Sequence, residues 1–323
     1  MTSVGFFGKY QSVNRKPGLF FLLIAALWNL LEDLSIRSKG KLPILRFLMA
    51  NRFNLSKAEK LNVELSLDLI FVCTSKDFEI LPISIRFALK ATKNYNVKKV
   101  IVITPQSDTE VATKVLSSFG EKIFVVNEDN LISYEQRERL RIKFKNRYGW
   151  ALQQILKVES VLKSNSDGVL IVDSDTLLIR SRNWLDQDRS QILMPSWEYN
   201  ISYYSYLDKL GISLKAPKYT FVTHHMLMQP WVLKEAFSAI GWSNVDSLIK
   251  SLLSENFLSS ESPFCVEYEF YGQYLWNNHR EKIRLEKWAN ISVSRSTLKE
   301  FGNTTRLLND FSQYASISLH SYL

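Results

Sequence analysis

Short apolar runs alternate with amphipathic stretches between residues 65 and 172. The apolar runs are rich in β-branched residues, as in strands buried on both faces, and span residues 67–74, 99–104, 122–126 and 168–172. The stretches with helical spacing span residues 80–95, 108–119 and 150–162. Strands that alternate with helices predict right-handed βαβ units, and therefore an α/β domain with a mostly parallel, Rossmann-like central sheet.

Polar residues follow each predicted strand. They are Thr74 to Asp77, Thr104 with Pro105, Asn127 to Asp129, and Asp173 to Asp175. Ligands of parallel sheets bind beyond the carboxyl ends of the strands. We therefore expect these four strand ends to face one crevice.

The second half of the chain is richer in aromatic residues and loops, with no repeat and no obvious linker. We expect it to continue the same domain, which then spans residues 65–323. The composition agrees, because 46% apolar and 13% aromatic residues exclude a disordered chain. The two cysteines, Cys73 and Cys265, cannot form a disulfide scaffold, and neither has a metal ligand at zinc spacing.

Residues 1–64 form an N-terminal helical segment that is basic and carries an apolar run at 19–31. This run of thirteen residues, interrupted by Asn29, is shorter than the roughly 20 residues that a spanning helix needs. No small-residue cleavage site follows it, as a signal peptide would require. We expect a helix that either packs on the domain or lies at an anionic membrane surface.

The net charge of +9 belongs mostly to residues 1–60, where ten cations and three anions give +7. The rest of the chain carries only +2, and its cations between residues 137 and 147 are interleaved with Glu138. This distribution argues against a nucleic-acid partner. It favours a cytoplasmic protein that is peripheral at the inner face of a membrane through residues 1–60.

The strongest local signal is Asp173-Ser-Asp175, at the end of a predicted strand. Two carboxylates on such a turn can face one hard cation, Mg²⁺ or Mn²⁺, and leave room for phosphates. The same spacing recurs at Asp186 and Asp188, but no strand leads into that pair. We expect a metal or nucleotide site at the first pair and a solvated loop at the second.

Five ordered motifs make the chain similar to a known family. They are Tyr148-Gly-Trp150-Ala-Leu-Gln153-Gln154-Ile-Leu-Lys157, Asp173-Ser-Asp175-Thr, Thr223-His224-His225-Met226, Glu267-Tyr-Glu269-Phe-Tyr-Gly272 and His320-Ser321-Tyr322. The set resembles, over roughly residues 66–322, the DUF6492 family of bacterial proteins assigned to the GT-A type of nucleotide-sugar glycosyltransferase. The resemblance implies a GT-A-like fold, a nucleoside-diphosphate sugar donor and a divalent metal cofactor.

The first motif places Trp150, Gln153, Gln154 and Lys157 at spacings that share one helix face. Two amides and a lysine there suit the binding of a base, ribose or diphosphate. The alternative is that Trp150 belongs to the core and Lys157 to a solvated helix end. Together with the strand ends and the histidine motif, the predicted donor-binding residues are Thr74, Asp77, Gln153, Gln154, Lys157, Asp173, Ser174, Asp175, His224 and His225.

Histidines occur in two of the motifs. His320 matches the C-terminal histidine that completes the metal site in many GT-A enzymes, so the resemblance implies Asp173, Asp175 and His320 as metal ligands. The alternative for His320 is a surface residue near the chain end. His224 and His225 are adjacent in a strand-like segment, whose neighbours face opposite ways, so at most one of them enters the crevice.

Glu267-x-Glu269-Phe follows Ser262-Pro263, where a helix could begin. The segment resembles the D-x-E-L pattern of inverting GT-A enzymes, which implies that Glu267 is the catalytic base and Glu269 supports it. Val266 departs from that pattern, which has an acid at this position. Acids at a helix N-terminus also complement the helix dipole, so a structural role stays open.

Together these features predict a metal-dependent glycosyltransferase that moves a sugar from a nucleoside-diphosphate sugar to the hydroxyl of a glycan or other acceptor, in cell-surface glycan or polysaccharide synthesis. One alternative is a non-catalytic nucleotide- or carbohydrate-binding protein of the same fold. The other is a nucleotidyltransferase, which has little support because the chain has no Gly-rich phosphate loop.

Overall fold

The structure of the chain is a computed structural model that describes residues 43–56, 58–59, 61, 64–214, 217–300 and 304–321. The apolar run at 19–31 lies outside these residues, so its packing on the domain or at a membrane stays a prediction. No helix among the described residues is long and apolar enough to cross a membrane.

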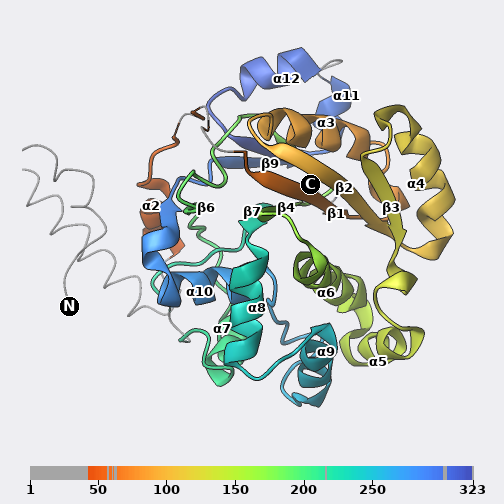
Figure 1. The fold of residues 1–323 in the computed structure, drawn as a ribbon, viewed down its shortest axis with the longest axis vertical. Helices are drawn as coiled ribbons and strands as arrows, with labels where there is room; N and C mark the ends of the chain where they lie inside the picture. Colours follow the sequence, from red (N-terminus) through yellow and green to blue (C-terminus); the bar gives the residue numbers. More distant parts are fainter. Residues whose placement is uncertain are drawn as a thin grey trace, which may run out of the picture.

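The centre of the molecule is a five-stranded sheet in the order β3-β2-β1-β4-β7 (Figure 1). Its parallel strands are β1 (Ser66–Val72), β2 (Asn96–Thr104), β3 (Ile123–Asn127) and β4 (Gly168–Val172). β7 (His225–Met228) pairs antiparallel with β4. The predicted α/β class with a mostly parallel sheet is confirmed, as are the four predicted strands, although β1 ends before Thr74.

Helices cover both faces of this sheet, which is why every residue of β1 and β4 is buried. One face packs against α3 (Leu81–Ala91) and α4 (Thr109–Leu116). The layer on the other face comprises α5 (Tyr134–Phe144), α6 (Tyr148–Lys163), α7 (Ile201–Lys209), α8 (Pro230–Ala239), α9 (Val245–Ser254) and α10 (Tyr268–Asn278). Figure 1 shows α6, α8 and α9 on one side of the sheet and α3 on the other.

The apolar pattern did not predict α5, because residues 134–147 look only like a charged stretch. A local signal was present: Ser133 and Gln136 form a capping box at the helix start. Within the helix only Leu140 and Phe144 are buried. A helix with so narrow an apolar face leaves almost no periodic signal in the sequence.

The winding of the sheet reverses at β1. From β1 the chain moves outward through β2 to β3, and then returns through α5 and α6 to β4 on the other side of β1. Ligands bind at such a reversal, beyond the carboxyl ends of the two adjacent strands. The crevice is therefore expected between the residues after Val72 and those after Val172.

A second sheet brings the C-terminal part of the chain to that crevice. β10 (Ser316–His320) lies between the antiparallel β5 (Thr176–Leu178) and the parallel β9 (Asn290–Ser294). β5 directly follows Asp175, so its pairing with β10 carries His320 to the D-x-D turn. Further elements are β6 (Gln191–Leu193), its partner β8 (Ile283–Leu285), α2 (Pro43–Asn51), α11 (Ser296–Glu300) and α12 (Thr304–Asp310).

Candidate active site

A cavity of about 660 Å³ opens beyond the carboxyl ends of β1 and β4. This volume lies in the range of about 300–1,000 Å³ that small-molecule sites occupy. The predicted residues that line it are Thr74, Asp77, Gln153, Lys157, Asp173, Ser174, Asp175, His224, Glu267 and His320. Three other predicted residues, Gln154, His225 and Glu269, are not part of its lining.

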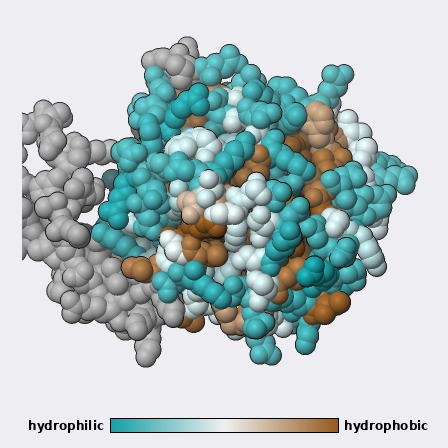
Figure 2. Space-filling view, turned by 60° about the horizontal axis from the view of Figure 1, so that its bottom comes forward, coloured by the Kyte–Doolittle hydropathy of each residue, from teal (hydrophilic) through white to brown (hydrophobic). Residues whose placement is uncertain are grey.

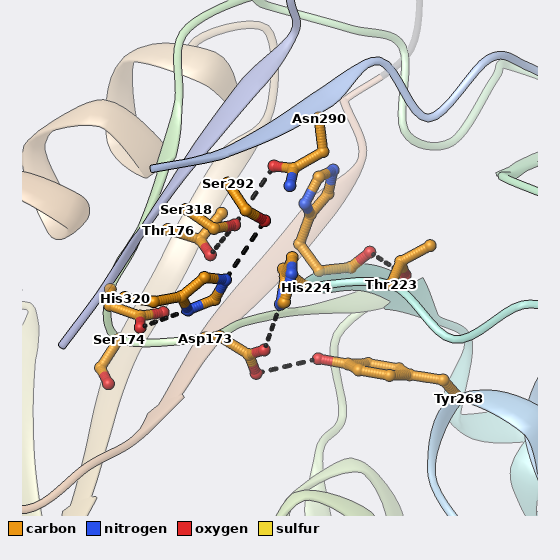
Figure 3. A network of polar contacts seen from close by, with 12 residues as sticks. Asp173, Ser174, Thr176, Thr223, His224, Tyr268, Asn290, Ser292, Ser318 and His320 are labelled. Atoms are coloured by element: carbon orange, nitrogen blue, oxygen red, sulfur yellow. Dashed lines mark hydrogen bonds and ion pairs between the residues drawn. The ribbon is translucent and has the colours of Figure 1, made fainter. Parts of the chain in front are cut away.

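Asp173 lies at the centre of the polar network in Figure 3. Its backbone N–H donates to the carbonyl of His224, which ties the end of β4 to the segment that enters β7. Its Oδ1 accepts from Lys157 Nζ at 2.8 Å and from the hydroxyl of Tyr268 at 3.3 Å, while its Oδ2 lies 3.2 Å from His224 Nδ1. Burial alone would raise the pKa of Asp173, but Lys157 and His224 lower it well below its usual range, so Asp173 is ionised.

Lys157 joins two carboxylates beneath the cavity. Only 1% of the residue is exposed, and its ammonium lies 2.8 Å from Asp173 Oδ1 and 2.9 Å from Glu267 Oε2. Burial lowers its pKa, but the two carboxylates raise it well above the ordinary value, so Lys157 stays charged. A solvated helix end is therefore excluded for this residue. The group of two anions and one cation is called the buried triad below.

Glu267 is the member of the triad at the start of α10, as predicted for a helix beginning there. It lines the cavity with 7% of its surface exposed. Burial raises the pKa of its carboxyl group, and Lys157 opposes that rise. Its position allows contact with a bound molecule, whereas its ion pair with Lys157 fixes one carboxylate oxygen.

Asp175 and His320 form the second polar pair of the cavity. Asp175 Oδ2 and His320 Nδ1 lie 3.3 Å apart. His320 Nε2 lies 3.2 Å from the hydroxyl of Ser292, a contact that Figure 3 shows. The backbone N–H of Leu319 donates to the carbonyl of Asp175, so strand pairing sets their separation. With 6% exposure on β10, His320 is not a surface residue at a frayed chain end.

The side chains of the cavity fit the predicted metal site only in part. Among the described residues, no group of three or more His, Cys, Asp and Glu side chains is arranged to hold a metal ion. Both carboxylate oxygens of Asp173 have protein partners, and so do both ring nitrogens of His320, which contact Asp175 and Ser292. Mg²⁺ in particular often takes one or two protein ligands and completes its shell with substrate phosphates and water. The metal site of Asp173, Asp175 and His320 therefore stays a prediction.

Arg295 connects the D-x-D turn to the end of β1. Asp77 accepts from Arg295 Nη2 at 2.7 Å and from the hydroxyl of Ser174 at 2.8 Å. The same guanidinium donates to the carbonyl of Lys76 and lies 4.0 Å from Asp175 Oδ2. Asp77 and Ser174 thus shape the turn, and Arg295 adds a cation to the cavity lining. No motif pointed to Arg295.

The two neighbouring glutamines have different positions. Gln153 lines the cavity, with its amide 3.4 Å from the carbonyl of Val72. Gln154 is fully buried, accepts from the N–H of Val266 and donates to the carbonyl of Phe264. It therefore holds the segment that leads to Glu267 rather than a ligand. Their spacing in the sequence does not show how wide a face of the helix meets the cavity, so it predicts a binding role for both glutamines.

His225 and Glu269 also have structural surroundings. His225 is 1% exposed and its ring meets the edge of Trp184, while burial and Arg182 lower its pKa well below the ordinary value. The expectation that at most one of the two histidines enters the crevice is met by His224. Glu269 accepts from the backbone N–H groups of Phe221 and Val222, and burial raises its pKa to about 7.

Sequence patterns missed part of the cavity lining. Glu198, from the loop between β6 and α7, borders the cavity and is itself exposed. Tyr203 stacks on Trp150, and Trp288 packs against His224 with ring centres 5.5 Å apart. The only hint of these residues was the aromatic richness of the second half of the chain.

The chain is similar to one described protein family and to several solved structures. Residues 66–206 match the family described as "Family of unknown function (DUF6492)". No curated protein matches the chain. Among solved structures, mouse xyloside xylosyltransferase 1 in its apo form is similar with a TM-score of 0.46 and 11% identity, over 80% of this chain and 99% of that one.

The galactosyltransferase LgtC, solved with donor and acceptor sugar analogs, is similar with a TM-score of 0.38 and 13% identity, over 78% of this chain and 86% of that one. An active-site mutant of LgtC gives the same values. The family match is the more informative result, because it runs from β1 into α7 and contains the D-x-D turn. The resemblance of this chain to DUF6492 is therefore confirmed over residues 66–206.

Proposed function

We propose that the protein is a glycosyltransferase that moves a sugar from a nucleoside-diphosphate sugar to an acceptor hydroxyl. One observation carries the proposal: the Asp175–His320 pair and the buried triad open into the same cavity, at the reversal of a parallel sheet. The cavity has room for a nucleotide sugar, and the resemblance of the sequence motifs to GT-A enzymes implies the same donor class.

The diphosphate is assigned to the side of the cavity with Asp175, His320 and Arg295. Asp175 and His320 would hold Mn²⁺ or Mg²⁺, which would neutralise negative charge on the departing diphosphate. Arg295 and Lys76, which also line the cavity, place two further cations there. Cations aimed at the position where charge develops are among the largest contributions to enzymatic catalysis.

The buried triad is assigned to the reacting sugar. Asp173 is held ionised by Lys157 and orients His224 through the Oδ2–Nδ1 contact. Lys157 also positions Glu267, and we assign to that carboxylate the proton of the attacking hydroxyl. The hydroxyl oxygen bonds to the anomeric carbon while the bond to the diphosphate breaks, and the diphosphate leaves with the electron pair. Such proton transfer typically contributes about 10²–10⁴-fold.

Isothermal titration with UDP and GDP, in the presence and absence of Mn²⁺, tests the donor site. We expect nucleotide binding that depends on the metal and that weakens roughly tenfold or more in Asp175→Ala. Asp188→Ala is the matched control, because this exposed aspartate has the same spacing in a loop outside the cavity. Absence of nucleotide binding, or equal binding by wild type and Asp175→Ala, contradicts the proposal.

Turnover separates the enzyme from a non-catalytic binding protein. Nucleotide binding with no release of UDP or GDP from any nucleotide sugar would favour the binding protein.

A peripheral membrane location is a separate proposal that rests on the basic residues 1–60. Flotation of the full chain with vesicles that contain anionic lipids tests it. Co-flotation that falls as salt is raised supports the proposal, since salt screens surface charge. A chain that stays at the bottom of the gradient contradicts it.

A further inference from the structure

A row of aromatic rings leads from the molecular surface into the cavity. Phe47 of α2 meets Trp197 with ring centres 5.3 Å apart, and Trp197 meets Trp288 at 5.1 Å. Trp288 in turn packs against His224, which contacts Asp173. The row therefore connects an exposed helix with the centre of the polar network.

Exposure distinguishes the rings of this row. Trp197 is 36% exposed, whereas Trp288 is 7% exposed and lines the cavity. The indole N–H of Trp288 is buried without a hydrogen-bond partner among the described residues. The same holds for the indole N–H of Trp184 outside the cavity, so the contribution of Trp288 to the cavity is its ring.

Hydrophobic residues also reach the surface elsewhere. Figure 2 shows them, in brown, in several places among hydrophilic residues on one face of the molecule. Exposure alone therefore does not single out Trp197. What sets it apart is its contact with a ring of the cavity wall and its place in the chain next to Glu198.

Glu198 gives this part of the cavity a free acceptor. Its carboxylate borders the cavity, and among the described residues no hydrogen bond or ion pair to it is found. The residue is exposed, so its carboxylate can be reached from solvent as well as from the cavity. A carboxylate in this position can accept hydrogen bonds from hydroxyl groups, and such charge-assisted bonds are short and strong.

An aromatic face beside a carboxylate matches the two sides of a sugar ring. A pyranose presents C–H groups on its face, which the electron-rich face of an indole attracts, and hydroxyl donors around its edge. A lipid alcohol would use the aromatic rings but has only one hydroxyl for Glu198. The side chain of a serine or threonine has no extended face to stack.

We infer that Trp197, Trp288 and Glu198 form an acceptor subsite for a carbohydrate, whose ring stacks on Trp197 and whose hydroxyls donate to Glu198. This inference rests on the proposed function and names its acceptor class. Glu198 and Trp288 line the cavity together with Glu267, and Trp197 contacts Trp288 from outside that lining, so a sugar bound there lies at the edge of the cavity that holds the triad. The surface position of Trp197 allows a longer glycan to continue beyond the cavity.

Saturation-transfer NMR with a panel of methyl pyranosides tests the subsite. The full chain is used with UDP or GDP and Mn²⁺, and the panel covers gluco, galacto, manno and N-acetylglucosamine configurations. We expect at least one glycoside to bind wild type and its affinity to fall on the order of tenfold in Trp197→Ala, which removes the stacking face. Glu198→Gln is expected to weaken binding less, because the amide oxygen still accepts a hydrogen bond.

The chain offers matched controls for both variants. Trp231→Ala removes a tryptophan that is 39% exposed and packs against His279, and Glu261→Gln neutralises an exposed glutamate away from the cavity. Both are expected to bind the glycoside as wild type does. Trp197→Phe, which keeps an aromatic face, should retain most of the binding and guards against a loss that comes only from misfolding.

The possible outcomes separate this inference from the proposed function. Wild type that binds no methyl pyranoside, or that binds one equally well in Trp197→Ala, overturns the acceptor subsite. So does a Trp197→Ala variant that loses affinity for the nucleotide sugar but not for the glycoside, because the ring would then contact the donor. Failure of wild type to bind UDP or GDP contradicts the proposed function instead.

Discussion

Two turns of this chain have the same D-x-D spacing and opposite surroundings. Asp173 and Asp175 follow a buried strand and line the cavity, where a lysine, two histidines and an arginine lie near them. Asp188 is exposed and accepts from the N–H and hydroxyl of Ser190, two residues further along the chain. The predicted solvated loop is thus met by Asp188, whereas Asp186 is partly buried and pairs with Arg284.

The difference shows that spacing alone does not make a site. The hydrogen bonds of Asp188 are local and would form in an isolated turn. The partners of Asp173 come from three separate segments, α6, the residues before β7 and α10, and only the folded sheet brings them together. Because Asp173 is partly buried, leaving its charge unpaired would cost stability, so each of these contacts stabilises the folded state.

Removing Lys157 is expected to have the largest effect. Lys157→Met leaves the buried carboxylate of Glu267 and the partly buried carboxylate of Asp173 without their shared cation, so the free energy of unfolding should fall by about 3–5 kcal/mol. Urea unfolding measures this loss. Lys163→Met on the same helix is the control, because Lys163 is 58% exposed in its ion pair with Glu159 and should change stability by about 0.5 kcal/mol or less. Equal effects of the two variants would contradict the account of the buried triad.

Glu269 extends the comparison to a buried carboxylate whose hydrogen-bond partners among the described residues include no cation. Its pKa is raised to about 7, so the folded chain binds this proton more tightly than the unfolded chain, where the ordinary value is 4.5. Stability should therefore fall as pH rises from about 4.5 to 7, by up to about 3 kcal/mol, and this contribution should level off above pH 7.

Unfolding of wild type and Glu269→Gln across this pH range measures the effect. The variant cannot titrate at this position, so its stability should lack that part of the decline. Parallel curves for the two proteins would show that Glu269 does not titrate as described.

Neutralising one aspartate of each turn gives a smaller contrast in stability. Asp173→Asn removes the charge that pairs with Lys157 and should lower the free energy of unfolding by about 1–3 kcal/mol. Asp188→Asn acts at an exposed position and should stay within about 0.5 kcal/mol. Thermal unfolding of both variants checks this. A larger loss in Asp188→Asn than in Asp173→Asn would reverse the comparison.

Local patterns predicted the sheet but only part of the site. The strands could be located because both faces of each are buried, which leaves a continuous apolar run in the sequence. Asp173 and Asp175 followed from their place at a strand end. His320 could be proposed only by resemblance, since its partner lies 145 residues earlier and the two meet through the pairing of β5 with β10.

Other parts of the site depend on packing that no spacing encodes. Gln153 and Gln154 are neighbours, yet only one meets the cavity, because α10 and its leading segment cover the other. Arg295 and Glu198 lie in loops, where no period fixes the direction of a side chain. Their roles follow from long-range contacts alone.

Turnover of nucleotide sugars tests the central claim most directly. Purified wild type, Asp175→Ala and Asp188→Ala are incubated with Mn²⁺ and a panel of UDP- and GDP-sugars, and released nucleotide is measured. We predict that wild type releases nucleotide from at least one donor, that Asp175→Ala is slower by about 100-fold, and that Asp188→Ala matches wild type. No release from any donor, or equal rates for wild type and Asp175→Ala, would contradict the assignment of this cavity as the active site of a glycosyltransferase.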